Sequence, residues 1–282
     1  MAMPVETTTW YPGDIISGAA EHHKGYGLVV LNQPLKLPIP FYSQIWKNSI
    51  FNVGADGGAN RVFDLDPAGS EPCQSLDAII GDLDSLRPAV REFWQDAGSE
   101  IIHDGDQYST DFTKAVRYLR GFQVPKDAEL IPSKSESRRA TLQKVKDGPE
   151  IKDIVCLGGL GGRVDQGMST LHHLYIFQKE PGYSSGRMFL LSNESITFVL
   201  QAGKHRVQVR AGPSSLGLGK NIGIIPLKEP SIITTNGLEW DVTDWPTEFG
   251  GQMSTSNHVK KDWVTIETTR DVLFSIDLDI NL

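Results

Sequence analysis

Residues 76–86 read "LDAIIGDLDSL", an apolar run that ends in glycine and is followed by two aspartates, Asp82 and Asp84. A short apolar run of this kind is typical of a buried strand. The aspartates have two interpretations. Asp84 or Ser85 can cap a helix that begins near Pro88, because Ser and Asp accept hydrogen bonds from the free N–H groups of a first turn and Pro is tolerated there. Alternatively, the two carboxylates point the same way from an extended backbone and bind Mg²⁺, which prefers carboxylate oxygen.

Three further runs repeat this form: "YGLVVLN" at 26–32, "IFNVGAD" at 50–56 and "IKDIVCLGG" at 151–159. Each is short and apolar and ends in loop residues, which is typical of buried strands in a parallel sheet. Helical patterns stand between and after them. The alternation predicts an α/β fold with a Rossmann-like parallel sheet, in which ligands bind beyond the carboxyl ends of the strands.

Two of the helical patterns predict a buried face. In "TDFTKAVRYLR" (110–120), with Ser109 or Thr110 as the N-cap, the spacing i, i+3, i+4, i+7 selects one apolar face. Its members are Phe112, Ala115, Val116 and Leu119. In "VDQGMSTLHHLYIFQ" (164–178) the corresponding face consists of Val164, Met168, Leu171 and Tyr175.

From about residue 187 the sequence changes to short strand-like runs separated by Asn-Gly, Pro and Gly, with no helical period. Asn236-Gly237 is a hairpin-turn signal. We therefore predict a C-terminal antiparallel β-sandwich domain at 187–282.

The α/β domain, with a nucleotide-binding role, is assigned to residues 26–186, after a leader at 1–25 that we expect to be flexible. Within the domain, the charged stretch 133–150 has almost no large apolar side chains. It is predicted to be a mobile surface insertion rather than a phosphate site built from Arg138 and Arg139.

The composition is that of an ordinary soluble globular protein, with 282 residues of which 39% are hydrophobic. The formal net charge of -8 argues against a broad basic face for nucleic acid. Cys73 and Cys156 are far apart and outside any C-x-x-C pair, and no histidine spacing favours zinc. The N-terminus lacks the regions of a signal peptide, and no apolar run approaches the length of a membrane span. We expect a cytoplasmic protein with neither nucleic-acid nor membrane partners.

Polar and glycine-rich motifs follow the predicted strands, so they belong on one edge of the sheet. They are "GADGGANR" (54–61), "GDLDSL" (81–86), "DQYSTDFTKA" (106–115) and "GGLGGRVDQ" (158–166), to which the β domain adds "NGLEW" (236–240) and "MSTSN" (253–257). In this order and spacing they resemble the thiamine pyrophosphokinase family, of the eukaryotic two-domain type. The resemblance extends from about residue 26 to residue 270.

The resemblance implies an enzyme, a transferase that moves the terminal diphosphate of ATP to the hydroxyethyl oxygen of thiamine. The products are thiamine diphosphate and AMP. Mg²⁺ is the implied cofactor and ATP the cosubstrate. The resemblance also implies a homodimer whose sites are built from both domains, with a contribution from the second subunit.

The resemblance further implies a role for each matching residue. The magnesium-binding and catalytic acids are Asp82, Asp84 and Asp111, with Asp56 as a further catalytic acid beside the reacting groups. ATP is expected to contact Asp56, Gly57, Gly58, Asn60, Arg61, Lys114, Gly159, Gly161, Arg163, Asp165 and Gln166. Thiamine is expected to contact Trp240, Ser256 and Asn257, and Gln107 of the neighbouring subunit. This chain has Tyr108 where many relatives carry another acid after the glutamine.

The residue types themselves suit this chemistry. Phosphoryl-type transfer depends mainly on positioning and charge neutralisation, which an acid-bound Mg²⁺ provides. Glycines 158, 159, 161 and 162 let backbone N–H groups approach phosphates at a helix N-terminus, where Arg163 adds a forked donor. Either Asp56 or Asp111 can orient the attacking hydroxyl or accept its proton. Trp240 can stack on the cationic, flat rings of thiamine.

Structural interpretations stand beside these assignments. Trp240 in a strand is by default a core aromatic, and Asp111 is most simply an acid that favours its own helix N-terminus. The glycine run can be only a tight strand-to-helix turn, and Arg163 a solvated surface charge. "STSN" at 254–257 is typical of a turn.

Two other functions also fit parts of the sequence. "DLDSL" can serve a nucleotide-sugar glycosyltransferase through an Asp-x-Asp metal site, and the same scaffold can hold thiamine or a nucleotide without catalysis. A dinucleotide-dependent dehydrogenase is disfavoured because Val164 stands where G-x-G-x-x-G needs its third glycine. A P-loop kinase is disfavoured because Asn221 follows Gly219-Lys220.

Overall fold

A computed structural model describes residues 6–19, 21–22, 25–65, 75–121, 129–131, 153–179 and 186–279. The chain divides into two compact units, Lys24–Asn193 and a second unit that combines Met1–His23 with Glu194–Leu282. The predicted insertion 133–150 lies outside the described residues.

The first unit is built on a parallel sheet, as the sequence predicts. Its strands, in spatial order, are β8 (Met188–Leu191), β7 (Ile154–Leu157), β2 (Tyr26–Val30), β3 (Ser49–Ala55), β4 (Ala78–Gly81), β5 (Glu100–His103) and β6 (Glu129–Ile131). All neighbouring pairs are parallel except β5 and β6, which are antiparallel. The residues of β2, β4, β7 and β8 are buried throughout, which explains their unbroken apolar runs.

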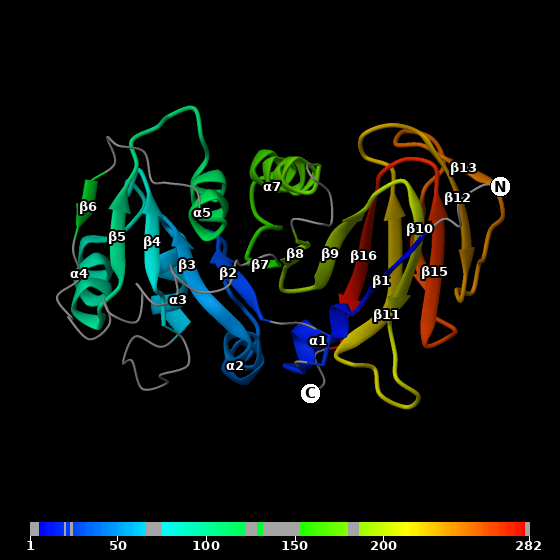
Figure 1. The fold of residues 1–282 in the computed structure, drawn as a ribbon, viewed down its shortest axis with the longest axis horizontal. Helices are drawn as coiled ribbons and strands as arrows, with labels where there is room; N and C mark the ends of the chain where they lie inside the picture. Colours follow the sequence, from blue (N-terminus) through cyan, green and yellow to red (C-terminus); the bar gives the residue numbers. More distant parts are fainter. Residues whose placement is uncertain are drawn as a thin grey trace. The chain divides into compact units, whose positions relative to one another are not determined.

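Helices cover both faces of this sheet (Figure 1). They are α2 (Ile39–Lys47), α3 (Gly58–Leu65), α4 (Pro88–Ala97), α5 (Asp111–Leu119) and α7 (Val164–Phe177). Helix α3 packs against β2, β3 and α4, whereas α5 packs against β3, β4 and α7. Since each strand is followed by a helix or a tight loop, the strand ends bring their loops to one edge of the sheet.

The sequence identified one buried helix face correctly and the other wrongly. Helix α5 buries Phe112, Ala115, Val116 and Leu119, and Thr110 is its N-cap, as predicted. Helix α7 instead buries Thr170, His173, Leu174 and Phe177. Val164 is 80% exposed and Met168 51% exposed, so the predicted face points away from the sheet. Apolar residues occur on both sides of α7, and the spacing alone selected the wrong side.

The second unit contains two sheets. One has five strands in the order β1 (Thr7–Trp10), β10 (Gly203–Gln208), β15 (Trp263–Thr268), β12 (Ser231–Asn236) and β13 (Trp245–Thr247). The other is ordered β14 (Ser254–His258), β11 (Leu218–Ile225), β16 (Val272–Leu278) and β9 (Ser195–Leu200). Trp10 of the first sheet stacks on Phe198 of the second at 4.6 Å between ring centroids, so the two sheets face each other across an aromatic core.

Residues 7–17 of the leader form a strand and a helix of this unit, contrary to the expectation of a flexible segment. Strand β1 pairs in parallel with β10, and Trp10 is fully buried. The Trp10 indole N–H donates to His205 Nδ1 at 3.2 Å. The short helix α1 (Pro12–Ser17) follows and buries Ile15 and Ile16. Pairing with a strand about two hundred residues away leaves no mark on the local sequence, which is why the pattern of residues 1–25 did not indicate it.

Two further boundaries differ from the prediction. Strand β8 pairs in parallel with β7, so residues 187–193 belong to the α/β unit rather than to the β unit. Asn236-Gly237 ends β12, but its antiparallel partner β13 begins only at Trp245. The turn is therefore a longer loop, in which the Asp241 carboxylate accepts from the Gly237 and Leu238 N–H groups.

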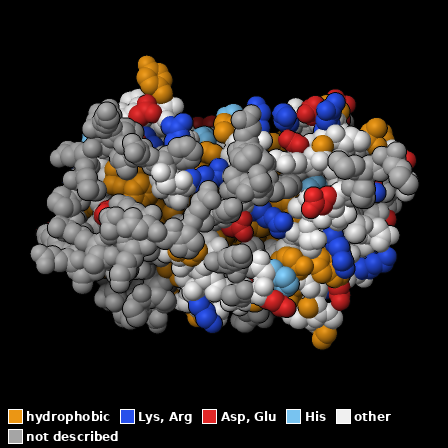
Figure 2. Space-filling view, viewed as in Figure 1, with side chains coloured by type: hydrophobic (Ala, Val, Ile, Leu, Met, Phe, Trp, Pro, Cys, Tyr) orange, Lys and Arg blue, Asp and Glu red, His pale blue; other side chains and the backbone are white. Residues whose placement is uncertain are grey.

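The surface carries charges of both signs. On the face drawn in Figure 2, lysine and arginine side chains are mixed with aspartate and glutamate among the described residues. Within the described part of the chain, no helix is both long enough and apolar enough to cross a membrane. Anion binding on the drawn face is therefore a matter of local groups rather than of one basic face.

Candidate functional site

Three carboxylates meet at the edge of the α/β sheet where β3 and β4 end. Asp56 follows β3, Asp82 follows β4 and Asp111 is the first residue of α5. One oxygen of each lies within 4.8 Å of the others. We call these three residues the acid cluster.

Asp56 is held in a conformation that few residues adopt. Its φ is 43°, in the left-handed region, and its N–H donates to the Ile80 carbonyl at 3.0 Å. Its Oδ2 accepts from the Ser85 N–H at 3.1 Å, whereas its Oδ1 is buried without a hydrogen-bond partner. Burial raises the pKa of Asp56, and the nearby Asp82 charge raises it further. A buried, unpartnered carboxylate oxygen is costly unless a cation approaches it.

Asp111 is fixed by its own helix and by a buried lysine. Burial raises the pKa of the Asp111 carboxyl, Lys114 opposes that rise, and the other two acids of the cluster add to it. Lys114 is 4% exposed, and its ammonium donates to the Asp104 carbonyl at 2.7 Å and to Asp111 Oδ1 at 3.4 Å. The expected ATP ligand Lys114 is thus placed as a buried counter-charge to Asp111.

The backbone at Gly81 makes room for the cluster. A Cβ atom at this position would lie 2.7 Å from Asp56 Cβ and 2.9 Å from Asp111 Oδ1. Only glycine therefore lets the end of β4 approach the two acids so closely. Convergent carboxylate oxygens, one of them unpartnered, form a hard-oxygen donor set that fits Mg²⁺.

Asp84 lies outside the acid cluster, although the sequence paired it with Asp82. Leu83 between them has φ 62°, in the left-handed region, so the backbone that joins the two acids is not the extended one that the prediction assumed. The Asp84 N–H instead donates to Asp82 Oδ1 at 3.2 Å, and the Asp84 side chain is exposed. It does not cap α4 either, because the N-cap there is Arg87, without a side-chain cap bond.

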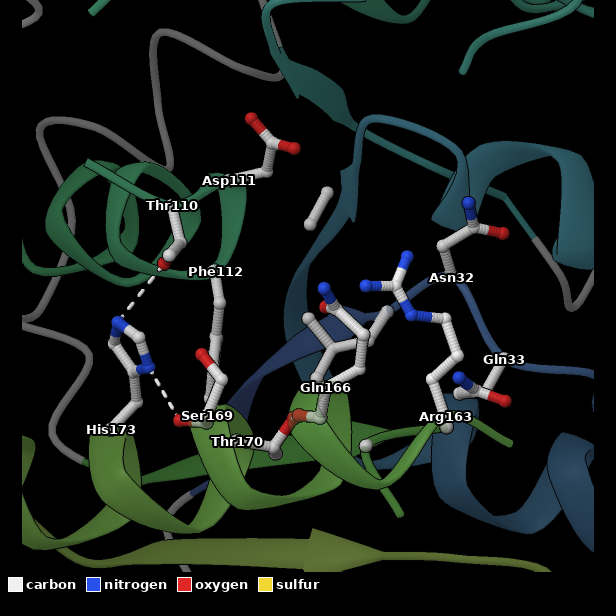
Figure 3. Close-up of a pocket in the computed structure, with 14 residues that line it drawn as sticks. Asn32, Gln33, Thr110, Asp111, Phe112, Arg163, Gln166, Ser169, Thr170 and His173 are labelled. Atoms are coloured by element: carbon white, nitrogen blue, oxygen red, sulfur yellow. Dashed lines mark hydrogen bonds between the residues drawn. The ribbon is translucent and has the colours of Figure 1, made fainter. Parts of the chain in front are cut away.

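A cavity of about 310 Å³ adjoins the cluster, with Asp111 in its wall (Figure 3). The loop after β2, the start of α5, the loop after β7 and helix α7 supply its walls. The lining residues are Leu31, Asn32, Gln33, Ala55, Thr110, Asp111, Phe112, Gly158, Gly159, Arg163, Gln166, Ser169, Thr170 and His173. Its volume is in the range of sites for small molecules.

The glycine-rich loop and the start of α7 form the polar end of this cavity. Gly158, Gly161 and Gly162 have positive φ values, 73°, 132° and 68°. Arg163 is the N-cap of α7, and its guanidinium binds Asp165 through Nε at 3.1 Å and Nη2 at 2.5 Å. In Figure 3 the Arg163 and Gln166 side chains rise from the start of α7 into the cavity. Free N–H groups at a helix start, beside a guanidinium, suit a phosphate.

The residues of "DGGANR" mainly shape the backbone beside the acid cluster and the cavity. A Cβ on Gly58 would lie 1.9 Å from the Val30 carbonyl oxygen, and one on Gly57 would lie 2.3 Å from the Asn32 amide nitrogen. Position 58 therefore requires glycine, because the obstacle there is backbone, whereas a Cβ at position 57 would displace the Asn32 side chain. Buried Asn60 donates to the Ser85 carbonyl at 2.7 Å and so ties α3 to the loop that carries Asp82.

Arg61 is the member of this motif that reaches the cavity wall. Its Nε donates to Asn32 Oδ1 at 2.9 Å, and Asn32 lines the cavity.

Two of the expected thiamine residues of the β unit contact each other. Trp240 is 58% exposed and thus is not a core aromatic. Its backbone is clamped by buried Asn257, whose Oδ1 accepts from the Trp240 N–H at 3.1 Å and whose Nδ2 donates to the Trp240 carbonyl at 2.9 Å. Ser256 beside it is exposed and has φ 55°. Asn257 therefore positions an aromatic surface on which a flat ring can stack.

Gln107 belongs to an exposed loop of the α/β unit. The Asp106 carboxylate accepts from the Tyr108 N–H at 2.9 Å, and Asp104 Oδ1 accepts from the Asp106 N–H at 3.1 Å. These bonds shape the loop and leave the Tyr108 side chain fully exposed beside Gln107.

Sequence reasoning missed several residues of the cavity wall. Asn32 and Gln33 directly follow a predicted strand, so the strand-end rule that selected the other motifs applies to them as well. Ser169, Thr170 and His173 had no such signal, because the opposite face of α7 was predicted to be buried.

Comparisons with known proteins cover most of the chain. Residues 42–182 match the family model "Thiamin pyrophosphokinase, catalytic domain", and residues 204–273 match "Thiamin pyrophosphokinase, vitamin B1 binding domain". The chain is 34% identical to thiamine pyrophosphokinase 3 of Oryza sativa over 266 residues, covering 90% of this chain and 87% of the relative. It is 29% identical to thiamine pyrophosphokinase of Saccharomyces cerevisiae over 276 residues, covering 90% and 86%.

Solved structures show the same fold. The structure of thiamin pyrophosphokinase from Candida albicans aligns with a TM-score of 0.73 at 25% identity, covering 99% of this chain and 95% of that one. The yeast thiamin pyrophosphokinase structure aligns with a TM-score of 0.76 at 24% identity, covering 99% and 93%.

Proposed function

Since the chain belongs to the thiamine pyrophosphokinase family and is an enzyme of that type, we propose that it transfers the terminal diphosphate of ATP to the hydroxyl of thiamine in a Mg²⁺-dependent reaction. The products are thiamine diphosphate and AMP. The observation that carries this proposal is the acid cluster, with its unpartnered Asp56 Oδ1, beside a cavity whose wall includes Asp111 and a helix N-terminus.

The acid cluster supplies the ligands for the metal in this proposal. Asp56, Asp82 and Asp111 offer one oxygen each from a confined space, and Gly81 leaves that space open. Mg²⁺, when bound, neutralises phosphate charge and draws the polyphosphate to a surface that would otherwise repel it. Asp84, exposed beside the cluster, is proposed to contribute through solvent rather than as a direct ligand.

The polar end of the cavity holds the nucleotide in this proposal. Backbone N–H groups at Gly159 and at the start of α7 are proposed to bind a phosphate, whose negative charge the helix dipole favours. Arg163 can donate two parallel hydrogen bonds to a phosphate when its ion pair with Asp165 opens. Arg61 and Asn32 line the approach from the opposite wall.

The attacking hydroxyl of thiamine needs a group that orients it and accepts its proton. We propose that a carboxylate of the acid cluster does so, either Asp56 or Asp111. Burial raises the pKa of both, which makes each a better proton acceptor than a solvated carboxylate.

Thiamine is proposed to stack on Trp240 and to meet Ser256 at its polar edge. The exposed indole and the clamp from Asn257 provide a preformed surface for a cationic, flat ligand. We further propose a cytoplasmic homodimer in which Gln107 reaches the thiamine of the second subunit. The exposed Gln107–Tyr108 loop and the exposed apolar side chains Val164 and Met168 support a contact with a second copy.

One assay tests the reaction. The protein is incubated with ATP, Mg²⁺ and thiamine, and AMP and thiamine diphosphate are measured. We expect equal amounts of both. Formation of ADP would mean monophosphate transfer and would defeat the proposal, and binding of thiamine without AMP release would indicate a non-catalytic binding protein. A matched incubation with a sugar nucleotide and Mn²⁺ tests for the glycosyltransferase alternative.

A further inference from the structure

Helix α7 carries a buried histidine that the proposed reaction does not use. His173 is 8% exposed and packs between the rings of Phe112 and Phe177, with centroid distances of 5.6 and 5.7 Å. Its two ring nitrogens form hydrogen bonds in different directions. Nδ1 lies 2.6 Å from the Ser169 carbonyl oxygen on its own helix, and Nε2 lies 3.0 Å from Thr110 Oγ1 (Figure 3).

The chemistry of these partners fixes the direction of each bond. A carbonyl oxygen only accepts, so His173 Nδ1 carries the proton and donates to Ser169. Burial lowers the pKa of His173, which keeps the ring neutral. Nε2 is then bare and accepts from the Thr110 hydroxyl.

Thr110 connects His173 to the acid cluster. It is the N-cap of α5, and its Oγ1 accepts from the Thr113 N–H at 3.2 Å. Because its hydroxyl proton points to His173, the lone pairs remain free for the cap. The next residue is Asp111, so the orientation of the cap sets the orientation of the first turn that carries this acid.

We propose that His173 is a positioning residue that holds Asp111 in the acid cluster: its Nε2 anchors the Thr110 cap of α5 to helix α7, the helix whose N-terminus faces the nucleotide. The inference rests on the proposed function of the cluster as a metal site. It links the metal-binding and the phosphate-binding helices through one hydrogen bond.

The test measures Mn²⁺ binding to the whole chain without substrates, by the electron paramagnetic resonance signal of free Mn²⁺. His173→Phe keeps a ring of similar size but removes the acceptor, and we expect about 10-fold weaker binding. His173→Gln restores an acceptor and should recover most of the affinity. His172→Gln, which changes the exposed neighbour on the same helix, is the matched control and should bind as the unchanged chain does.

A double-mutant cycle tests whether His173 acts on Asp111 through Thr110. If His173 acts through Thr110, then Thr110→Val weakens binding by a similar factor, and adding His173→Phe to it weakens binding no further. Additive losses, or normal Mn²⁺ binding by His173→Phe, would overturn the inference. Should His173→Phe not fold, His173→Leu, which also removes the acceptor, is compared with His173→Gln, which keeps one, and equal Mn²⁺ binding by the two would overturn the inference.

Asp111→Asn separates this inference from the proposed function. Lost affinity in Asp111→Asn together with normal affinity in His173→Phe refutes the positioning role alone. If the unchanged chain does not bind Mn²⁺, or if Asp111→Asn binds it unchanged, the metal site itself is refuted, and the positioning role with it.

Discussion

Replacement of Asp56 by asparagine should stabilise the fold while it abolishes activity. The Asp56 carboxylate is buried, one of its oxygens has no partner, and two other carboxylates lie within 4.8 Å of it. Two unit charges at 4.8 Å repel each other by roughly 3 kcal/mol at an effective dielectric constant of about 20. The cluster relieves part of this by taking up protons, so we expect Asp56→Asn to raise the free energy of unfolding by about 1–3 kcal/mol.

The effect should depend on pH with a definite sign. Burial raises the pKa of Asp56 above its ordinary value of 3.8, so the folded protein retains a proton that the unfolded chain has released. Ionisation of Asp56 therefore does not lower the free energy of unfolding below pH 3.8. Above that pH the free energy of unfolding falls until the pH passes the raised pKa of Asp56 in the folded protein. The stabilisation from Asp56→Asn should accordingly be larger at pH 8 than at pH 3.8 or below.

The assay is thermal unfolding in EDTA and again in excess Mg²⁺. In EDTA the gain corresponds to a melting temperature about 3–9 °C higher than that of the unchanged chain. In Mg²⁺ the gap should narrow, because the metal stabilises the unchanged chain and binds the variant poorly. Asp84→Asn, at an exposed carboxylate outside the cluster, should leave both melting temperatures unchanged. An Asp56→Asn protein that melts lower than the unchanged chain in EDTA would refute the view that the cluster is strained without a cation.

Three further predictions concern individual positions. Asp82→Asn should lower kcat, measured by AMP release, by about 100-fold or more with little change in the melting temperature, whereas Asp84→Asn should lower kcat less than 10-fold. Equal losses of kcat in the two variants would contradict the geometry of the cluster. Trp240→Ala should raise the KM for thiamine by about 2- to 30-fold, the equivalent of about 0.5–2 kcal/mol, and leave the KM for ATP unchanged. Trp240→Phe should give an intermediate KM for thiamine. An unchanged KM for thiamine in Trp240→Ala would remove Trp240 from the thiamine site. Gly81→Ala places a methyl group 2.7 Å from Asp56 Cβ. It should lower the free energy of unfolding in urea by about 1–3 kcal/mol and should also weaken Mn²⁺ binding. Normal values of both would show that the end of β4 can shift.

The sequence predicted the architecture where local patterns suffice. The apolar runs identified β2, β3, β4 and β7, because strands buried on both faces are apolar throughout. The cap Thr110 and the buried face of α5 were also correct, since α5 has a single apolar face. Convergence of the motifs followed from the parallel sheet itself.

The errors arise where distant parts of the chain decide the outcome. Residues 7–10 become a strand only because β10 lies beside them. The extended backbone expected between Asp82 and Asp84 was wrong, because Leu83 adopts a left-handed conformation that its residue type does not indicate. The role of Asp56 in the cluster depends on its own left-handed backbone and on Gly81, neither of which is visible in spacing.

The position of β1 has a consequence for the order in which the protein is made. The α/β unit is one continuous segment, so it can fold as soon as it leaves the ribosome. Trp10 and its partner His205 are 195 residues apart, and β10 in turn pairs with β15, which is synthesised later still. During synthesis, residues 7–10 therefore remain without their strand partner until β10 has been made.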